Sequence, residues 1–214
     1  MSPEEYKAIL AKYMPADAVE PVHAFMDKYC VHLHITRKRT SKLGDYRWPQ
    51  QGHNYQEISV NGDMNPYQFL LVLLHEMAHL NTHQRHGNDI QPHGHEWQEQ
   101  YRQLLLQYQP CFPDDITTLI ALYTARIPLS RTIGKQIDEQ LRHYDANYDP
   151  STELTLDQLP PGTVFRIAAK PQKTFRSLEK RRTRWICLGL DDQRKYLVHG
   201  SARVVIEESD KYLC

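Results

Sequence analysis

The spacing of hydrophobic residues predicts helices over much of the first 150 residues. Residues 2–13 and 15–29 carry apolar side chains three and four positions apart, and each stretch opens with Ser or Pro followed by acidic residues. This period places the apolar side chains on one helix face, and the opening residues are helix-start signals. After Asn65 and Pro66, which suit the N-cap and first helical position, no helix breaker follows until Gly87. We therefore expect a central helix between them.

Three more helices are expected beyond this central helix. Gly87 and Pro92 interrupt the periodic pattern. Helical spacing then resumes in three stretches, residues 93–109, 113–125 and 130–144.

A small β-sheet is expected before the central helix. Residues 31–36 alternate apolar and polar side chains, which is the period of a half-buried strand. Residues 41–55 have the Gly, Asp and Pro of a loop, and residues 56–62 form a second short strand pattern that ends in Asn-Gly. The sequence predicts a hairpin or a small sheet here.

The pattern changes beyond residue 150. A polar stretch with three prolines, residues 145–162, indicates a domain boundary. Short β-rich segments separated by turn residues follow it, as in a small antiparallel barrel or rolled sheet. The expected fold class is therefore α+β, with a helical domain and its small sheet over residues 1–150 and a small β-barrel-like domain over residues 151–214.

Composition places the chain among ordinary globular proteins. Apolar residues make up 40% of the 214 residues and charged residues 24%. The polar N-terminus does not resemble a signal peptide, and no apolar run approaches the roughly 18 residues of a membrane span. The four Cys are far apart and form neither a CxxC pair nor a disulfide framework. We expect a cytoplasmic protein that does not contact a membrane.

The net charge of zero hides an asymmetry between the two parts of the chain. Residues 1–162 carry 14 Lys and Arg against 20 Asp and Glu, whereas residues 163–214 carry 12 against 6. The net charges are therefore −6 and +6. A basic unit attached to an acidic body often marks contact with nucleic acid or another polyanion.

The chemistry of the chain is concentrated in the central helix. His75, Glu76 and His79 form an HExxH motif. Positions i and i+4 project from one helix face, so the two imidazoles can bind one Zn²⁺ at about 2.0–2.1 Å. Glu76 turns about 100° away, where it can act as general base on a metal-activated water. Two histidines plus one further ligand leave a fourth position open, as catalytic zinc sites do.

The residues alone leave four candidates for the third ligand. His83 continues the i+4 spacing, but a straight helix rarely presents three successive turns to one ion. Glu99 lies twenty residues after His79, close to the spacing of gluzincin carboxylates. His93 and His95 both lie at the start of the next helix, from which the loop could fold either of them back.

A resemblance narrows this choice. "LLHEMAHL" followed by "HGHEW" resembles the SprT-like family of zinc metallopeptidases, relatives of the DNA–protein crosslink protease Spartan. The resemblance covers roughly residues 5–110 and includes "SKLGDY", "ISVN" and "NPYQFL". It implies a zincin-like protease core, a Zn²⁺ cofactor and a protein or peptide substrate. The family's second motif, His-Gly-x-x-aromatic, corresponds here to His93, Gly94 and Trp97 and implies His93 as the third ligand.

The C-terminal unit departs from the family pattern. Many members carry a Cys-rich zinc ribbon there, which four scattered Cys cannot build. Instead, seven Lys and Arg lie between residues 170 and 184 together with Phe175 and Trp185. This composition is typical of a groove that follows phosphates and stacks bases, and equally of a charged hairpin whose aromatic residues face its own core.

These observations together predict a zinc metallopeptidase that acts on proteins associated with DNA. The ligands would be His75, His79 and His93, with Glu76 as the catalytic base. A non-catalytic metal-containing scaffold or nucleic-acid-binding protein is the alternative, which the intact Glu76 argues against. A hydrolase of small amides would use the same residues.

Overall fold

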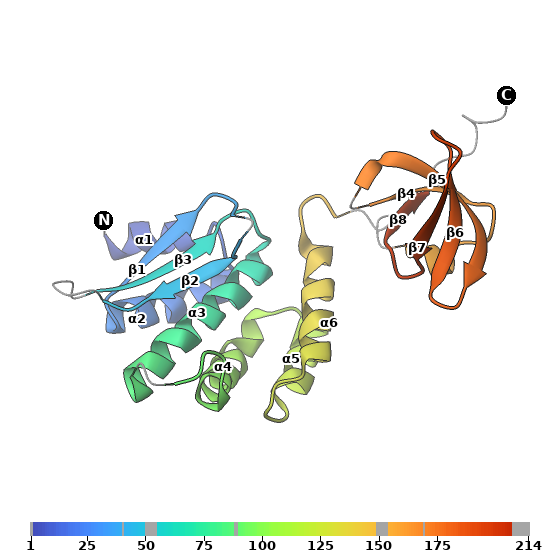
Figure 1. Ribbon diagram of the computed structural model, residues 1–214. Helices are drawn as coiled ribbons and strands as arrows, with labels where there is room; N and C mark the ends of the chain where they lie inside the picture. The colour runs from blue at the N-terminus through green and yellow to red at the C-terminus, as the bar shows by residue number, and fades with distance from the viewer. Residues whose placement is uncertain are drawn as a thin grey trace. The chain divides into compact units, whose positions relative to one another are not determined.

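The computed structural model describes residues 2–39, 41–49, 55–87, 90–148, 154–168 and 170–206. The chain divides into two compact units, Met1–Ala146 and Asn147–Cys214. The described residues form six α-helices and two β-sheets, so the predicted α+β class is confirmed (Figure 1).

A three-stranded sheet lies in the first unit. Its strands are β1 (Val31–Thr36), β2 (Gly44–Arg47) and β3 (Gln56–Asn61), in the order β1-β3-β2. β1 runs parallel to β3, whereas β2 runs antiparallel to β3. Of the two predictions, the small sheet is therefore correct and a hairpin between β1 and β3 is not, because a tight turn cannot join parallel strands. β2 forms one edge of the sheet.

The N-terminal helices form where the sequence predicts them. The helices are α1 (Pro3–Leu10), α2 (Ala16–Lys28) and the central helix α3 (Pro66–His86). The Asn65 side chain caps α3 by accepting a hydrogen bond from the Gln68 N–H at 2.9 Å, and Pro66 occupies the first turn. α3 packs along β2 and β3 (Figure 1), so one helix both carries the HExxH motif and supports the sheet edge.

Three further helices complete the first unit. They are α4 (His95–Tyr108), α5 (Asp114–Thr124) and α6 (Arg131–Leu141), with short 3₁₀ turns η1 (Gln109–Cys111) and η2 (Arg142–Tyr144). α4 packs against α3, and α5 packs against α6. One continuous apolar core joins the helices and the sheet, and fully buried side chains of α3 such as Phe69, Leu73 and Met77 belong to it.

The second unit is a five-stranded antiparallel sheet. Its elements are the 3₁₀ turn η4 (Leu156–Gln158) and strands β4 (Val164–Ile167), β5 (Lys170–Arg181), β6 (Arg184–Gly189), β7 (Lys195–His199) and β8 (Val204–Ile206). The strand order is β7-β6-β5-β4-β8. Four of these strands match the β-rich segments that the sequence predicts at residues 163–168, 183–190, 195–200 and 202–208. β5 coincides with the basic segment, for which a charged hairpin was one of two interpretations. β7 and β8 lie at opposite ends of this order and do not pair with each other. The described strands therefore form an open sheet rather than a closed barrel.

The two aromatic residues of the basic segment belong to the core of this sheet. Phe175 is 5% exposed and Trp185 is 4% exposed. The Trp185 indole N–H donates a hydrogen bond to Asp157 Oδ1 at 2.7 Å. The hypothesis that these rings stack on bases is therefore wrong, because alternate residues of a strand face inward and these two occupy inward positions.

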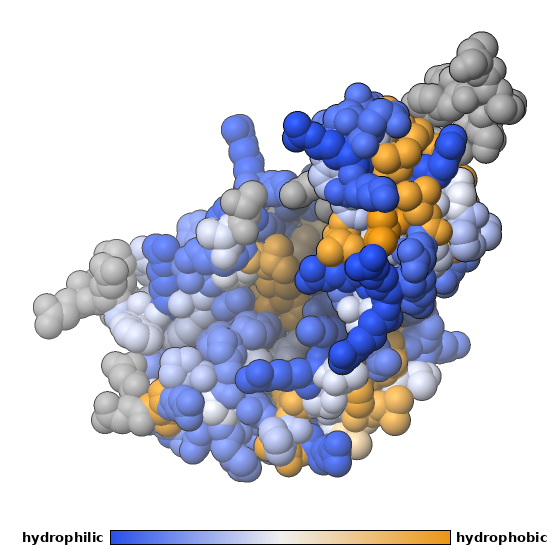
Figure 2. All heavy atoms as spheres, turned by 45° about the vertical axis from the view of Figure 1, so that its right-hand side comes forward, coloured by the Kyte–Doolittle hydropathy of each residue, from blue (hydrophilic) through white to orange (hydrophobic). Residues whose placement is uncertain are grey.

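The face of the molecule drawn in Figure 2 is largely polar. Hydrophilic side chains cover most of the face drawn in Figure 2, and apolar side chains form smaller patches between them. None of the described helices combines the length and apolarity needed to cross a membrane. Cys30, Cys111 and Cys187 are free thiols, of which Cys187 is buried, and Cys214 lies outside the described residues. The cytoplasmic location stays a prediction.

Candidate metal centre

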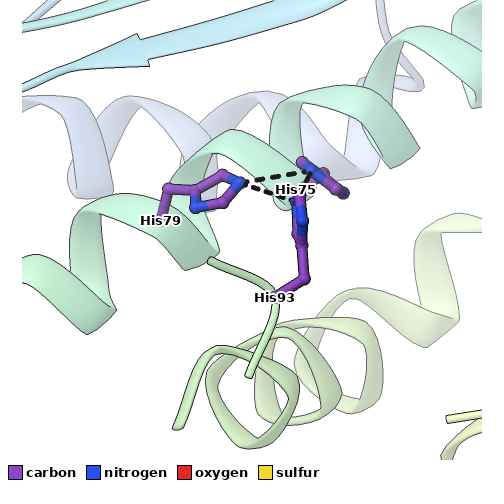
Figure 3. Close-up of side chains that lie close together, drawn as sticks. All are labelled: His75, His79 and His93. Carbon is purple, nitrogen blue, oxygen red and sulfur yellow. Dashed lines mark hydrogen bonds between the residues drawn. The ribbon is translucent and has the colours of Figure 1, made fainter. Parts of the chain in front are cut away.

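Three imidazoles converge on one point beside α3. His75 and His79 project from successive turns of α3, and His93 reaches them from the loop before α4 (Figure 3). The Nε2 atoms lie 3.3 Å apart between His75 and His79, and 3.1 Å apart from His93 to each of them. The structure thus brings together the three residues that the sequence and the resemblance selected.

Hydrogen bonding alone does not account for this triangle. A neutral imidazole nitrogen either carries a proton or accepts one, so at least two of three mutually adjacent Nε2 atoms must be of the same kind. A shared cation satisfies all three lone pairs. Ligand nitrogens at about 2.0–2.1 Å from a tetrahedral Zn²⁺ lie roughly 3.3 Å apart, and the observed separations of 3.1–3.3 Å fit that value. The cluster could hold a metal ion.

The loop before α4 places His93 through a backbone conformation that the sequence does not reveal. His93 has a φ of 58°, in the left-handed region. Its carbonyl accepts a hydrogen bond from Gln98 Nε2 at 3.0 Å, which ties the loop to the first turn of α4. A Cβ on Gly94 would lie 2.9 Å from the Gln91 carbonyl oxygen, which explains why glycine follows the histidine.

Trp97 packs against all three imidazoles. Its ring centroid lies 4.6 Å from those of His75 and His93 and 5.4 Å from that of His79. The side chain is 6% exposed. Trp97 therefore packs between the first turn of α4 and the histidines of α3.

The edge strand β2 packs against Glu76, the residue that follows His75 on α3. The Tyr46 backbone N–H donates to the Glu76 carboxylate. Gly44 lies so close that a Cβ there would collide with Glu76 Oε1. Glu76 is 6% exposed, so its carboxylate is fixed between the helix and the strand.

The electrostatics of the centre favour neutral imidazoles and a carboxyl that titrates near neutrality. Burial, and then the neighbouring imidazoles, lower the pKa of His75 to about 3 and that of His79 to about 4. Burial also lowers the pKa of His93. Burial, and then Asp45, raise the pKa of Glu76 to about 7 against the opposing effect of Lys42. Neutral imidazoles are the form that binds metal.

The other candidate ligands lie elsewhere. The Nδ1 atom of His83 lies 3.3 Å from the Tyr46 hydroxyl, and its ring stacks on Trp48. Glu99 accepts a hydrogen bond from Gln103 and lies 3.6 Å from Arg102. His95 is the first residue of α4 and is exposed. Of the four candidates, the structure brings His93 into the cluster.

Sequence reasoning missed several residues that surround the centre. Gly44 and the Tyr46 backbone contact Glu76, and Gly44 lies in the "SKLGDY" segment, which the resemblance included without a role. Tyr101 and Asp138 line cavities beside His75. No pattern in the sequence indicates Asp138, because it lies on a polar helix that only the fold brings near α3.

Two histidines and a buried glutamate on one helix, joined by a third histidine from a following loop, form the arrangement of a metallopeptidase-type centre. The comparison with known families agrees. Residues 21–115 match the SprT-like family, which is related to zinc metallopeptidases, so the predicted resemblance is confirmed for this segment. The segment includes the whole triad and ends in the first turn of α5, leaving α6 and the second unit outside. No curated protein and no solved structure matches the chain.

Proposed function

We propose that the chain is a zinc-dependent metallopeptidase with a zincin-like core, in which His75, His79 and His93 bind the metal and Glu76 is the general base. The single observation that supports this most strongly is the convergence of three Nε2 atoms within 3.1–3.3 Å beside a buried carboxylate. A structural zinc site fills all four positions with protein ligands, whereas three histidines leave one position for water.

The proposed chemistry divides between the cofactor and the protein. A zinc ion in such a site activates a water near neutral pH and polarises the substrate carbonyl. Glu76 takes the proton of the attacking water on its carboxylate and returns it to the leaving amine. The Tyr46 N–H and the closeness of Gly44 orient that carboxylate, while Trp97 keeps the imidazoles in place.

The proposed substrates are proteins associated with DNA. The support is the basic second unit, whose residues 163–214 carry 12 Lys and Arg against 6 Asp and Glu. Arg181, Arg182 and Arg184 are exposed around the turn between β5 and β6, where phosphates could reach them. We propose that the five-stranded sheet of this unit acts as a polyanion-binding module.

Metal analysis and cleavage assays of matched variants test the peptidase proposal. Glu76→Gln is expected to keep stoichiometric zinc and the wild-type melting temperature and to lose roughly 100- to 10,000-fold in cleavage rate, because the amide keeps the shape but cannot take the proton. His93→Ala is expected to lose zinc. His95→Ala is the control and is expected to keep both zinc and activity.

Each variant can contradict a different part of the proposal. Wild-type cleavage by Glu76→Gln would exclude Glu76 as the base. Zinc loss in His95→Ala but not in His93→Ala would exclude the proposed ligand set. A zinc-loaded wild-type protein that cleaves neither proteins nor peptides would favour the scaffold alternative, and cleavage of small amides alone would favour the other hydrolase.

A further inference from the structure

Two cavities open beside His75. Their volumes are about 360 and 300 Å³, at the lower end of the range for ligand pockets. Both are lined by Leu71, His75, Tyr101 and Asp138. One also touches His93 and Trp97, and the other touches Glu76. Any side chain that enters them stands directly next to the candidate catalytic groups.

Aromatic rings form one wall of this space. Tyr101 stacks on Trp97 with ring centroids 4.8 Å apart, and it meets His75 edge-on at 5.6 Å. Tyr123 of α5 lies edge-on to Tyr101 at 6.4 Å and lines the larger cavity. Leu71 and Ile137 add apolar surface. Such a wall accepts an aliphatic stem, and its ring faces attract a cation.

Asp138 supplies a carboxylate to both cavities. It lies on α6 and is exposed to solvent. Among the described residues, no hydrogen bond or ion pair reaches its carboxylate, although Arg142 acts on it through space. Partial burial, and then Glu139, raise the pKa of this carboxyl against the opposing effect of Arg142. An apolar side chain in the cavity would displace water from the Asp138 carboxylate without replacing the lost hydrogen bonds. A cationic side chain would instead form an ion pair with the carboxylate.

We propose that this space is a specificity pocket for a lysine or arginine side chain next to the scissile bond, with Asp138 as the residue that recognises the cation. The proposal rests on the peptidase function proposed above. It adds a selection rule that comes from α5 and α6, and the segment matched to the SprT-like family ends in the first turn of α5.

Peptide binding tests the pocket without requiring turnover. Zinc-loaded Glu76→Gln protein is titrated, at about 0.15 M salt, with peptides that lack His and Cys and differ at one position by lysine, arginine, norleucine or glutamate. We expect lysine and arginine peptides to bind at least about tenfold more tightly than the norleucine peptide, which is isosteric with the lysine stem. Adding Asp138→Asn should remove the difference.

Glu139→Gln is the matched control. It removes one negative charge from the same helix at an exposed residue that lines neither cavity, so it should keep the preference. Asp138→Lys should reverse the preference, so that the glutamate peptide binds most tightly. Retention of zinc and of the wild-type melting temperature shows that each variant is folded. In proteins that keep Glu76, cleavage sites are mapped by mass spectrometry. The kcat/KM values for the peptides should follow the same order as their affinities.

The outcomes separate the pocket from the peptidase function. Equal binding of all peptides, no measurable binding, or a lysine preference that survives Asp138→Asn overturns the pocket. If lysine peptides bind preferentially through Asp138 and yet no peptide is cleaved, the pocket stands and the peptidase function fails.

Discussion

At the scale of single residues, the closest constraint on the proposed base is Gly44. Its backbone does not have a left-handed φ, so alanine is conformationally acceptable there. The new Cβ, however, would collide with Glu76 Oε1 and lie 2.9 Å from Cδ. Because Glu76 is buried against β2, it must move. We predict that Gly44→Ala lowers kcat/KM roughly 100-fold, the cost of misplacing a reacting group by about 1 Å, with zinc content and melting temperature unchanged.

A double-mutant cycle identifies the cause of that loss. If Gly44 acts through Glu76, then adding Gly44→Ala to Glu76→Gln should change the residual activity little, because the group that it displaces is already inactive. Losses that simply add in the double variant would show that Gly44 affects another part of the site.

The sequence predicted the residues whose spacing carries the chemistry and missed those that only the fold brings together. His75, Glu76 and His79 follow from the helical period, since i and i+4 share a face. His93 required the resemblance, because the residues alone left His95 and Glu99 open. Asp138 lies 59 positions beyond His79, and no local pattern relates the two.

At the scale of elements, amphipathic periodicity predicted the helices well and the sheets less well. The central helix begins and ends where expected, because Asn65 caps its N-terminus and Gly87 follows its last residue. The parallel pairing of β1 with β3 was missed, since short strands carry no signal for their neighbours. β5 was not assigned as a strand by itself because half of its twelve residues are charged, so the composition also suited a phosphate-binding groove.

The contact between η4 and β6 makes the second unit sensitive to acid. The hydrogen bond from Trp185, and then Lys180, hold the pKa of the Asp157 carboxyl below its usual value. A carboxyl whose folded pKa is lowered stabilises the fold above its unfolded pKa, about 3.9, and loses that contribution as pH falls through the folded pKa. We predict that the unit loses stability below about pH 4.

The Asp157→Asn variant isolates this contribution in the full chain. Its amide oxygen can still accept the indole N–H but does not titrate in this range. The stability difference between wild type and variant, followed through the Trp185 indole resonance during thermal unfolding, should shrink as pH falls below about 4. A difference that stays constant from pH 7 to pH 2 would contradict the assignment. Asp192 forms an ion pair with Lys173, which lowers the pKa of its carboxyl. The loss of stability that comes from protonating Asp192 should therefore occur in both proteins.

At the scale of the whole molecule, charge and fold divide the chain in a consistent way. The acidic part holds the candidate metal centre and an acidic residue in its pocket, whereas the basic part is a separate sheet with its own core. The balance of charges changes close to the Pro-rich stretch in which the two compact units meet along the chain. It could not predict which basic residues stay available; Lys180 pairs with Asp157 at 3.0 Å and Lys173 with Asp192 at 2.7 Å.

The remaining exposed arginines allow a prediction about nucleic acid. If Arg181, Arg182 and Arg184 contact phosphates, binding of the full protein to DNA should weaken linearly in log K against log salt by about 0.7 to 0.9 per contact. Changing all three to Glu should lower both the affinity and the slope, the slope by roughly 2 to 3. Because Phe175 and Trp185 are buried, we expect little base preference, and Trp185→Ala should unfold the second unit rather than weaken stacking.

The matched control places the same charge change on the first unit. Arg126, Arg131 and Lys135 are also exposed, so their reversal to Glu alters the net charge equally without touching the β5–β6 turn. Fluorescence anisotropy with labelled DNA at several salt concentrations distinguishes the two triple variants. An equal loss in both would mean that net charge alone drives binding. A wild-type protein that does not bind DNA at low salt would leave the proposed peptidase with a second unit that recognises something other than nucleic acid.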